Sequence, residues 1–213
     1  MKLIKLLMPL GMIGAVAYML HALIGPALWR EYNSMVTDLS TLTADNSPIA
    51  GQMRVFTYTN GICLVLFSLG VCARGRSEYH AATRAGYWIF LFMALVSTVG
   101  YAFYPLMGDK KVMIFQNRMH LVVTIVVMLS TLAALYVLSY GYFRKERRAL
   151  PGWLSLMTAL IMTVFGALSM VMMAGGSIFG LMQRISIYTL QGYVFMLSFL
   201  MTFEPERVGL ELL

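Results

Sequence analysis

The stretch that decides the fold is MHLVVTIVVMLSTLAALYVLSYGY, residues 119–142, which contains no Arg, Lys, Asp or Glu. A helix of about 20 residues crosses the ~30 Å hydrocarbon core of a bilayer, because each residue adds about 1.5 Å. Comparable apolar stretches occupy residues 6–28, 53–72, 85–104, 153–174 and 185–203. The sequence therefore predicts an all-α fold, a polytopic transmembrane bundle of six helices.

Composition supports this class and leaves no room for a second domain. The residues AVILMFWYC make up 60% of the chain and the mean hydropathy is +0.76, whereas soluble domains average about 45–50% apolar residues. Lys2 and Lys5 precede a first apolar run that continues to Leu28, too long for the apolar region of a signal peptide. Residues 1–213 are therefore predicted to form a single transmembrane domain that includes this first span.

Basic residues predict the orientation of the bundle, because cytoplasmic connections are enriched in Lys and Arg. Of the 16 basic residues, the side that carries both termini has Lys2, Lys5, Arg74, Arg76, Arg84, Arg144, Lys145, Arg147, Arg148 and Arg207. Both termini are thus predicted to be cytoplasmic (N-in/C-in). These residues flank spans and form no continuous patch, so we expect no binding of nucleic acid.

The longest polar connection, residues 30–51, is predicted to lie on the outer side. It is rich in Ser, Thr, Asn and Asp, and the sequence DNSP at residues 45–48 is typical of a turn before the second span. Four apolar residues recur in it at near-helical spacing: Met35, Val36, Leu39 and Leu42. This spacing predicts a short helix that lies against the mouth of the bundle.

Three arginines stand at the outer ends of the second, fourth and sixth spans: Arg54, Arg118 and Arg184. Each lies at a helix N-terminus, where it opposes the helix dipole, and on the side that is normally poor in basic residues. Free N–H groups and guanidinium groups together favour binding of phosphate or carboxylate. The alternative is that each arginine pairs with an acidic loop residue or extends to lipid headgroups. Gln183 and His21 complete the candidate ligand-binding set.

The histidines allow two chemical readings, since an ionisable side chain within a span is a candidate for function. His120 with Asp38 and Ser40 would form an acyl-transfer set, in which histidine is the base and the carboxylate orients it. His21 and His120, with Asp38 or Asp109, would instead form a metal site. Neither set has a diagnostic local motif, so no metal is assigned and the cofactor is left unknown.

Small residues predict close helix packing in two places. Ser155, Ala159, Thr163 and Ala167 recur at every fourth position of the fifth span, which favours close approach of a neighbouring helix. Gly175, Gly176 and Gly180 precede the sixth span and are expected to allow a tight turn and a close backbone contact.

Several short motifs resemble a known family. They are Asp38-Leu39-Ser40 followed by Thr43-Ala44 and Ser47-Pro48, Phe103-Tyr104-Pro105, His120, and Gly180-Leu181-Met182-Gln183-Arg184-Ile185 with Gln191 beyond. The chain resembles the prokaryotic six-span family known as domain-of-unknown-function family 998, usually grouped with the eukaryotic Frag/DRAM/Sfk proteins. The resemblance implies a six-span fold, an outward polar cluster and an association with membrane lipids.

These observations give two functional hypotheses of different classes. The first is an integral membrane protein that binds a lipid headgroup or another anionic ligand at its outer face. The alternative is a membrane hydrolase or acyltransferase acting on a lipid or lipid-linked substrate, with His120 as base, Asp38 orienting it and Ser40 as nucleophile. A transporter is disfavoured, because the spans lack acidic residues for ion coupling. The expected partners are membrane lipids and the location is a prokaryotic inner membrane; the oligomeric state is left open.

Overall fold

The computed structural model describes residues 2–108, 112–172 and 177–209, and this part of the chain is helical, without strands. The six long helices are α2 Leu10–Leu28, α3 Ala50–Glu78, α4 Ala81–Phe103, α5 Phe115–Gly141, α6 Ala149–Met172 and α7 Phe179–Phe203. The short elements are α1 Lys2–Leu7, η1 Leu39–Thr43, η2 Tyr142–Glu146 and η3 Pro205–Val208.

Within the described residues, six helical segments are long and apolar enough to cross a membrane, which confirms the predicted fold class. The first of them, Ile4–Leu28, joins α1 and α2. Most helices run past the predicted apolar stretches; α3, for example, continues to Glu78, whereas the apolar stretch ends at residue 72. Hydropathy marks the part of a helix that crosses hydrocarbon, and polar helix-forming residues continue the same helix beyond it.

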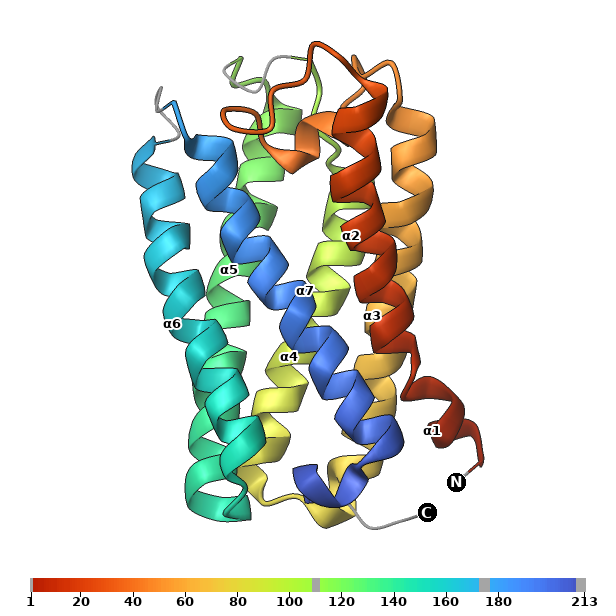
Figure 1. The fold of residues 1–213 in the computed structure, drawn as a ribbon, viewed down its shortest axis with the longest axis vertical. Coiled ribbons are helices and arrows are strands. Elements are labelled where there is room, and N and C mark those ends of the chain that lie inside the picture. Colours follow the sequence, from red (N-terminus) through yellow and green to blue (C-terminus); the bar gives the residue numbers. More distant parts are fainter. Residues whose placement is uncertain (1, 109–111, 173–176, 210–213) are drawn as a thin grey trace.

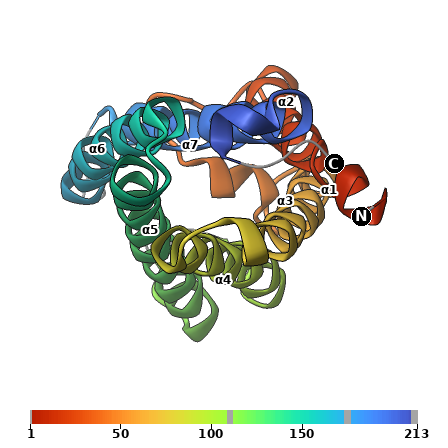
Figure 2. The ribbon, with the colours of Figure 1, turned by 90° about the horizontal axis from the view of Figure 1, so that it is seen from below.

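The helices form a closed ring in chain order. Each long helix packs against its neighbours in sequence, and α7 completes the ring by packing against α2 (Figure 2). Both termini lie at one end of the bundle, which we call the termini end, and the connection of residues 29–49 lies at the other, the loop end (Figure 1). Antiparallel neighbours in sequence, all but α2 and α3 joined by comparatively short connections, produce this arrangement.

The half of the ring near the termini end is filled by large side chains. Phe67, Phe90 and Leu138 are among its fully buried residues. The hydroxyl groups of Tyr87 and Tyr142 are 2.5 Å apart, and Tyr142 also donates to the hydroxyl of Tyr79 at 3.2 Å. The hydroxyl groups of these three tyrosines are therefore bonded to one another.

The stripe of small residues predicted in α6 is only partly a packing surface. Ser155 and Ala159 are fully buried, and Ser155 is 3.1 Å from the hydroxyl of Tyr193 on α7. Thr163 and Ala167 are exposed, so the prediction is wrong for these two positions. A four-residue repeat drifts around a helix of 3.6 residues per turn, so the buried face continues instead through Met162.

The connection between α2 and α3 folds back into the ring. Its short helix η1 buries Leu39 and Leu42, as the apolar spacing predicted, but Met35 and Val36 are exposed and lie outside η1. Figure 2 shows this orange segment inside the ring of helices. Gly175 and Gly176 lie outside the described residues. η1 thus supplies polar residues to the interior at the loop end.

Candidate functional site

The first turns of α7 hold the connection of residues 29–49 in place. Arg184 is buried, and its Nη1 donates to the carbonyl oxygens of Ser34, of Thr37 at 2.9 Å and of Gly180 at 3.0 Å. Its Nη2 donates to the hydroxyl of Tyr32. A buried guanidinium needs several acceptors of this kind to offset the loss of water. Arg184 therefore acts as an anchor for the loop.

Two neighbours of Arg184 on α7 strengthen this attachment. A Cβ atom on Gly180 would lie 2.5 Å from the carbonyl oxygen of Thr37, so only glycine allows the loop to approach α7 this closely. Gln183 accepts a hydrogen bond from the backbone N–H of Leu39 at 3.0 Å, which fixes the start of η1. The predicted close contact at Gly180 thus serves the loop.

Asp38 organises the start of η1 from the inside. Its carboxylate accepts hydrogen bonds from the hydroxyl of Ser40 at 3.0 Å and from the hydroxyl of Thr41. The hydroxyl of Tyr32 donates to the backbone carbonyl of Asp38 at 2.8 Å. Burial raises the pKa of Tyr32 to about 12, so this hydroxyl keeps its proton at neutral pH and remains a donor.

Below η1, at the loop end, the ring surrounds a cavity of about 170 Å³ that is lined by both polar and apolar groups. That is room for several water molecules or for a small polar group. Its polar lining includes Tyr18 and His21 of α2, Ser40 and Thr43 of η1, Arg54 and Asn60 of α3, Thr98 and Tyr101 of α4, His120 and Thr124 of α5, and Gln183 of α7. Residues from five of the long helices therefore meet at one site.

His21 and Asn60 are the most unusual members of this lining. His21 is 1% exposed, and neither of its ring nitrogens has a hydrogen-bond partner among the described residues. Asn60 is 9% exposed, and its Oδ1 is likewise unpartnered there. A buried polar group without a partner costs about 1–3 kcal/mol, so each such group calls for an explanation, of which a bound water, ion or ligand is one.

His120 lies in the same lining but is held by its neighbours. Its Nδ1 is 2.8 Å from the carbonyl oxygen of Tyr104. A carbonyl oxygen only accepts, so Nδ1 carries a proton. The ring centroid lies 5.0 Å from that of Tyr101, whose hydroxyl donates to Thr124 at 3.1 Å. His120 is thus oriented from two sides, by Tyr101 of α4 and by Tyr104, the residue that follows α4.

Arg54 brings a positive charge to the cavity. Its Nε and Nη2 donate to the carbonyl oxygen of Thr43 at 3.1 and 3.0 Å, which ties α3 to the end of η1. The guanidinium is only partly buried. It therefore retains donor capacity towards an anion in the cavity.

The cavity brings together five of the residues singled out in the sequence: His21, Ser40, Arg54, His120 and Gln183. The three arginines do not share this lining. Arg118 is exposed, and its Nε donates to the carbonyl oxygen of Met113 at 2.7 Å, while Arg184 is taken up by the loop. Asp38 reaches the lining through its bond to Ser40.

Sequence reasoning did not single out Tyr18, Asn60, Thr98, Tyr101 or Thr124. The sequence nevertheless contained a signal, because some of these polar residues lie at helical spacing from His21 or His120. Tyr18 precedes His21 by three positions and Thr124 follows His120 by four, so each pair shares one helix face. Polar faces within four apolar spans point to a common interior site.

The arrangement of the acyl-transfer candidates differs from the predicted one. The proton of the Ser40 hydroxyl is directed at Asp38 Oδ2, whereas the predicted order places histidine between serine and carboxylate. No three His, Cys, Asp or Glu residues gather into a metal-binding group within residues 2–108, 112–172 and 177–209. Asp109, one of the metal candidates, lies outside the described residues.

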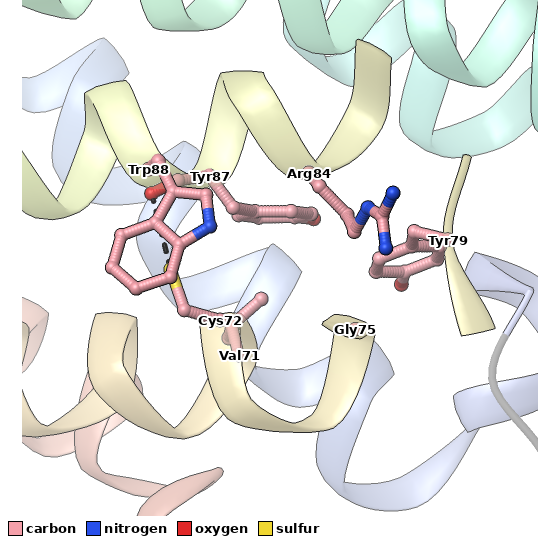
Figure 3. A pocket seen from close by; sticks show the side chains of 7 residues that line it. All are labelled: Val71, Cys72, Gly75, Tyr79, Arg84, Tyr87 and Trp88. Carbon is pink, nitrogen blue, oxygen red and sulfur yellow. Dashed lines mark hydrogen bonds between the residues drawn. The ribbon is translucent and has the colours of Figure 1, made fainter. Parts of the chain in front are cut away.

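A second hollow, near the termini end, does not form a comparable site. It lies between α3 and α4 and is lined by Val71, Cys72, Gly75, Tyr79, Arg84, Tyr87 and Trp88 (Figure 3). Its cavity volume is about 0 Å³, so it holds no water-sized group. The thiol of Cys72 donates to the carbonyl oxygen of Tyr87 at 3.4 Å across it. We interpret this hollow as a surface feature of helix packing.

Comparison with known families assigns the chain to one of them. The model of the family described as "Protein of unknown function (DUF998)" matches residues 12–200. The chain belongs to this family. The match runs from α2 to α7 and includes all the cavity-lining residues of this DUF998 protein. No curated protein and no solved structure matches the chain significantly.

Proposed function

We propose that this integral multi-pass membrane protein binds a lipid headgroup or another anionic ligand in the cavity at its loop end. The observation that carries the proposal is the pair of buried, unpartnered polar groups, His21 and Asn60, that face this cavity. A ligand that bonds to them recovers free energy that the protein alone leaves unmet.

The charge of the lining favours an anion. Arg54 lies in it, whereas no carboxylate of the described residues does, and the carboxylate of Asp38 accepts from Ser40 and Thr41. Hydroxyl groups and imidazole N–H groups add neutral donors around the cavity. A phosphate or carboxylate group suits this set of donors.

Native mass spectrometry of the protein purified from membranes tests this proposal. Wild-type protein is expected to carry a bound adduct, and His21→Leu and Arg54→Gln are expected to reduce its occupancy about tenfold, the effect of one good hydrogen bond to the ligand. Arg118→Gln is the matched control, because Arg118 is exposed and outside the lining. Equal occupancy in all four proteins, or no adduct in the wild type, would contradict the proposal.

The proposed orientation places the loop end outside a prokaryotic inner membrane and both termini in the cytoplasm. The asymmetry of the basic residues supports it, and the resemblance to the Frag/DRAM/Sfk grouping agrees with a role at membrane lipids. Single cysteines at the exposed positions Glu31 and Arg76, in a protein without Cys63 and Cys72, test the orientation. An impermeant thiol reagent should label only the Glu31 position in intact cells; the reverse pattern would overturn it.

A second candidate function, hydrolysis or acyl transfer on a lipid-linked substrate, has one observation in its favour. Ser40 and His120 line the same cavity, and Asp38 accepts the Ser40 hydroxyl proton at 3.0 Å. A nucleophilic serine should react with a lipophilic fluorophosphonate probe, with the label on Ser40 and lost in Ser40→Ala. Absence of labelling in native membranes would count against this reading and leave binding as the function.

A further inference from the structure

One wall of the cavity reaches the outer surface of the ring. On α3 the lining residues are Arg54, Thr57, Tyr58, Asn60 and Gly61, and on α4 they are Ser97, Thr98, Tyr101 and Ala102. Tyr58 is 51% exposed and Ala102 is also exposed, although both line the cavity. In a bundle that crosses a membrane, an exposed side chain within a span faces lipid. The cavity therefore has a side opening between α3 and α4.

This side opening ends where the two helices come into close contact. A Cβ atom on Gly61 would lie 2.9 Å from the side chain of Thr98, so α3 and α4 approach closely at this level. The contact forms the floor of the side opening. Above it, towards the loop end, Thr57 and Tyr58 face Tyr101 and Ala102 across the cavity wall.

Towards the loop end the cavity is covered by connected loops. Arg54 bonds to the carbonyl oxygen of Thr43, and the backbone N–H of Asp45 donates to the carbonyl oxygen of Leu106 at 3.2 Å. The carboxylate of Asp45 accepts from the N–H of Gly108 at 2.6 Å. These bonds join η1, the turn after it and the segment after α4 into a cover. A route through the cover crosses these hydrogen bonds, whereas no described hydrogen bond joins the lining residues of α3 to those of α4.

The surface around the side opening is apolar. On α3, Val55 is 63% and Ile62 55% exposed; on α4, Val99 is 49% and Phe103 72% exposed. In a membrane these side chains already face hydrocarbon. A lipid acyl chain can therefore lie between them without displacing water or breaking a polar contact. The polar groups His21 and Asn60 lie inside the cavity. The side opening therefore leads from an apolar outer surface to polar groups in the interior.

We propose that the ligand is a membrane lipid that enters sideways between α3 and α4, with its polar headgroup at His21 and Asn60 and an acyl chain in the side opening. This inference rests on the proposed function and adds the class of ligand and its route. A water-soluble anion that crosses the cover from the aqueous side would be the other source of the same headgroup chemistry.

Photo-crosslinking in nanodiscs tests the position of the acyl chain. The probe is phosphatidylglycerol with a diazirine near the headgroup end of one acyl chain, and the adducts are mapped by peptide mass spectrometry. We expect adducts on residues that line the cavity, above all Thr57, Asn60 and Tyr101. Adducts confined to the outward residues Val55 and Val99, as on any lipid-facing helix, would overturn the inference.

A matched pair of variants tests the route. Ala102→Trp places a large side chain in the side opening, whereas Val99→Trp places the same side chain on the same helix, exposed but outside the lining. Ala102→Trp should abolish the cavity adducts and Val99→Trp should leave them, with unchanged thermal stability in both. Equal cavity adducts in the two variants would contradict entry between α3 and α4.

The two proposals fail in distinguishable ways. In the first case, His21→Leu removes the native adduct, glycerol 3-phosphate alone displaces this adduct from the wild type, and Ala102→Trp retains the adduct. The cavity then binds a soluble anion, and the inference about lipid is wrong. If His21→Leu retains the adduct while Ala102→Trp removes it, a lipid does occupy the side opening, and the headgroup site at His21 is wrong.

Discussion

The tyrosine cluster near the termini end and the cavity near the loop end differ in how their buried polar groups are bonded. Near the termini end, the hydroxyls of Tyr79, Tyr87 and Tyr142 bond to one another among tightly packed aromatic and aliphatic side chains. Near the loop end, His21 and Asn60 are equally buried but have unpartnered atoms beside a cavity. Inside a membrane protein an unmet polar group is costly, whereas a closed network is stable. The contrast separates side chains that hold the fold from side chains that we propose to contact a ligand.

The largest expected effect comes from Arg184, which belongs to the loop half and whose two Nη atoms are hydrogen-bonded to protein groups, while its buried Nε has no partner among the described residues. Arg184→Gln removes a charged donor from the carbonyl oxygens of Ser34 and Thr37 and from the hydroxyl of Tyr32. Each hydrogen bond to a charged group contributes about 1.5–3 kcal/mol, so we expect a loss of about 3 kcal/mol or more in the free energy of unfolding, measured in detergent.

The control for Arg184 is Arg118→Gln, which removes a single bond from an exposed arginine and should cost less than about 1 kcal/mol. If the two variants are equally stable, Arg184 is not the anchor of the loop. The cover of the cavity would then be held by contacts other than those of Arg184.

A smaller effect is expected for packing in α6. Ala159 is fully buried, so Ala159→Leu should cost about 1–3 kcal/mol by overpacking. Ala167 is exposed on the same helix, and Ala167→Leu should change stability by less than about 0.5 kcal/mol. Thermal unfolding of both in the same detergent makes the comparison; a similar cost for both variants would mean that the face with Ala167 is packed.

The cluster of Tyr79, Tyr87 and Tyr142 tests the comparison in the termini half of the ring. Tyr142→Phe removes the hydroxyl shared by Tyr79 and Tyr87 and should cost about 1–2 kcal/mol, with no change in bound lipid. Tyr136→Phe is the control, since Tyr136 is 39% exposed and bonds only to the hydroxyl of Thr163 among the bonds described. Loss of lipid in Tyr142→Phe would contradict the division into two halves.

Much of the fold followed from the sequence, because transfer of about 20 apolar residues into hydrocarbon is a property of each segment alone. Helix ends such as Glu78 did not follow, since hydropathy does not register a helix that continues into water. The order of the ring also required tertiary contacts. The error at Ala167 has the same origin: which face of α6 is buried depends on where α5 and α7 lie.

The candidate site was predictable in part. His21 and His120 stood out as ionisable residues in apolar spans, and both line the cavity. The inference that Arg54, Arg118 and Arg184 form one anion site was weaker. The direction of a long side chain depends on which carbonyl oxygens lie within its reach in the folded chain. Those acceptors belong to Thr43, Met113 and the loop before η1, and no local pattern places them.

The measurement that tests the central claim most directly is His21→Leu, assayed for both stability and bound lipid. Leucine fills similar space and removes two ring nitrogens that have no described partner. The delipidated variant should therefore be as stable as the wild type or slightly more stable, because replacing an unmet buried polar group by an apolar one is neutral or favourable. Its native mass spectrum should show the loss of the lipid adduct. A destabilised variant that keeps its lipid would show that His21 supports the fold and would contradict the account.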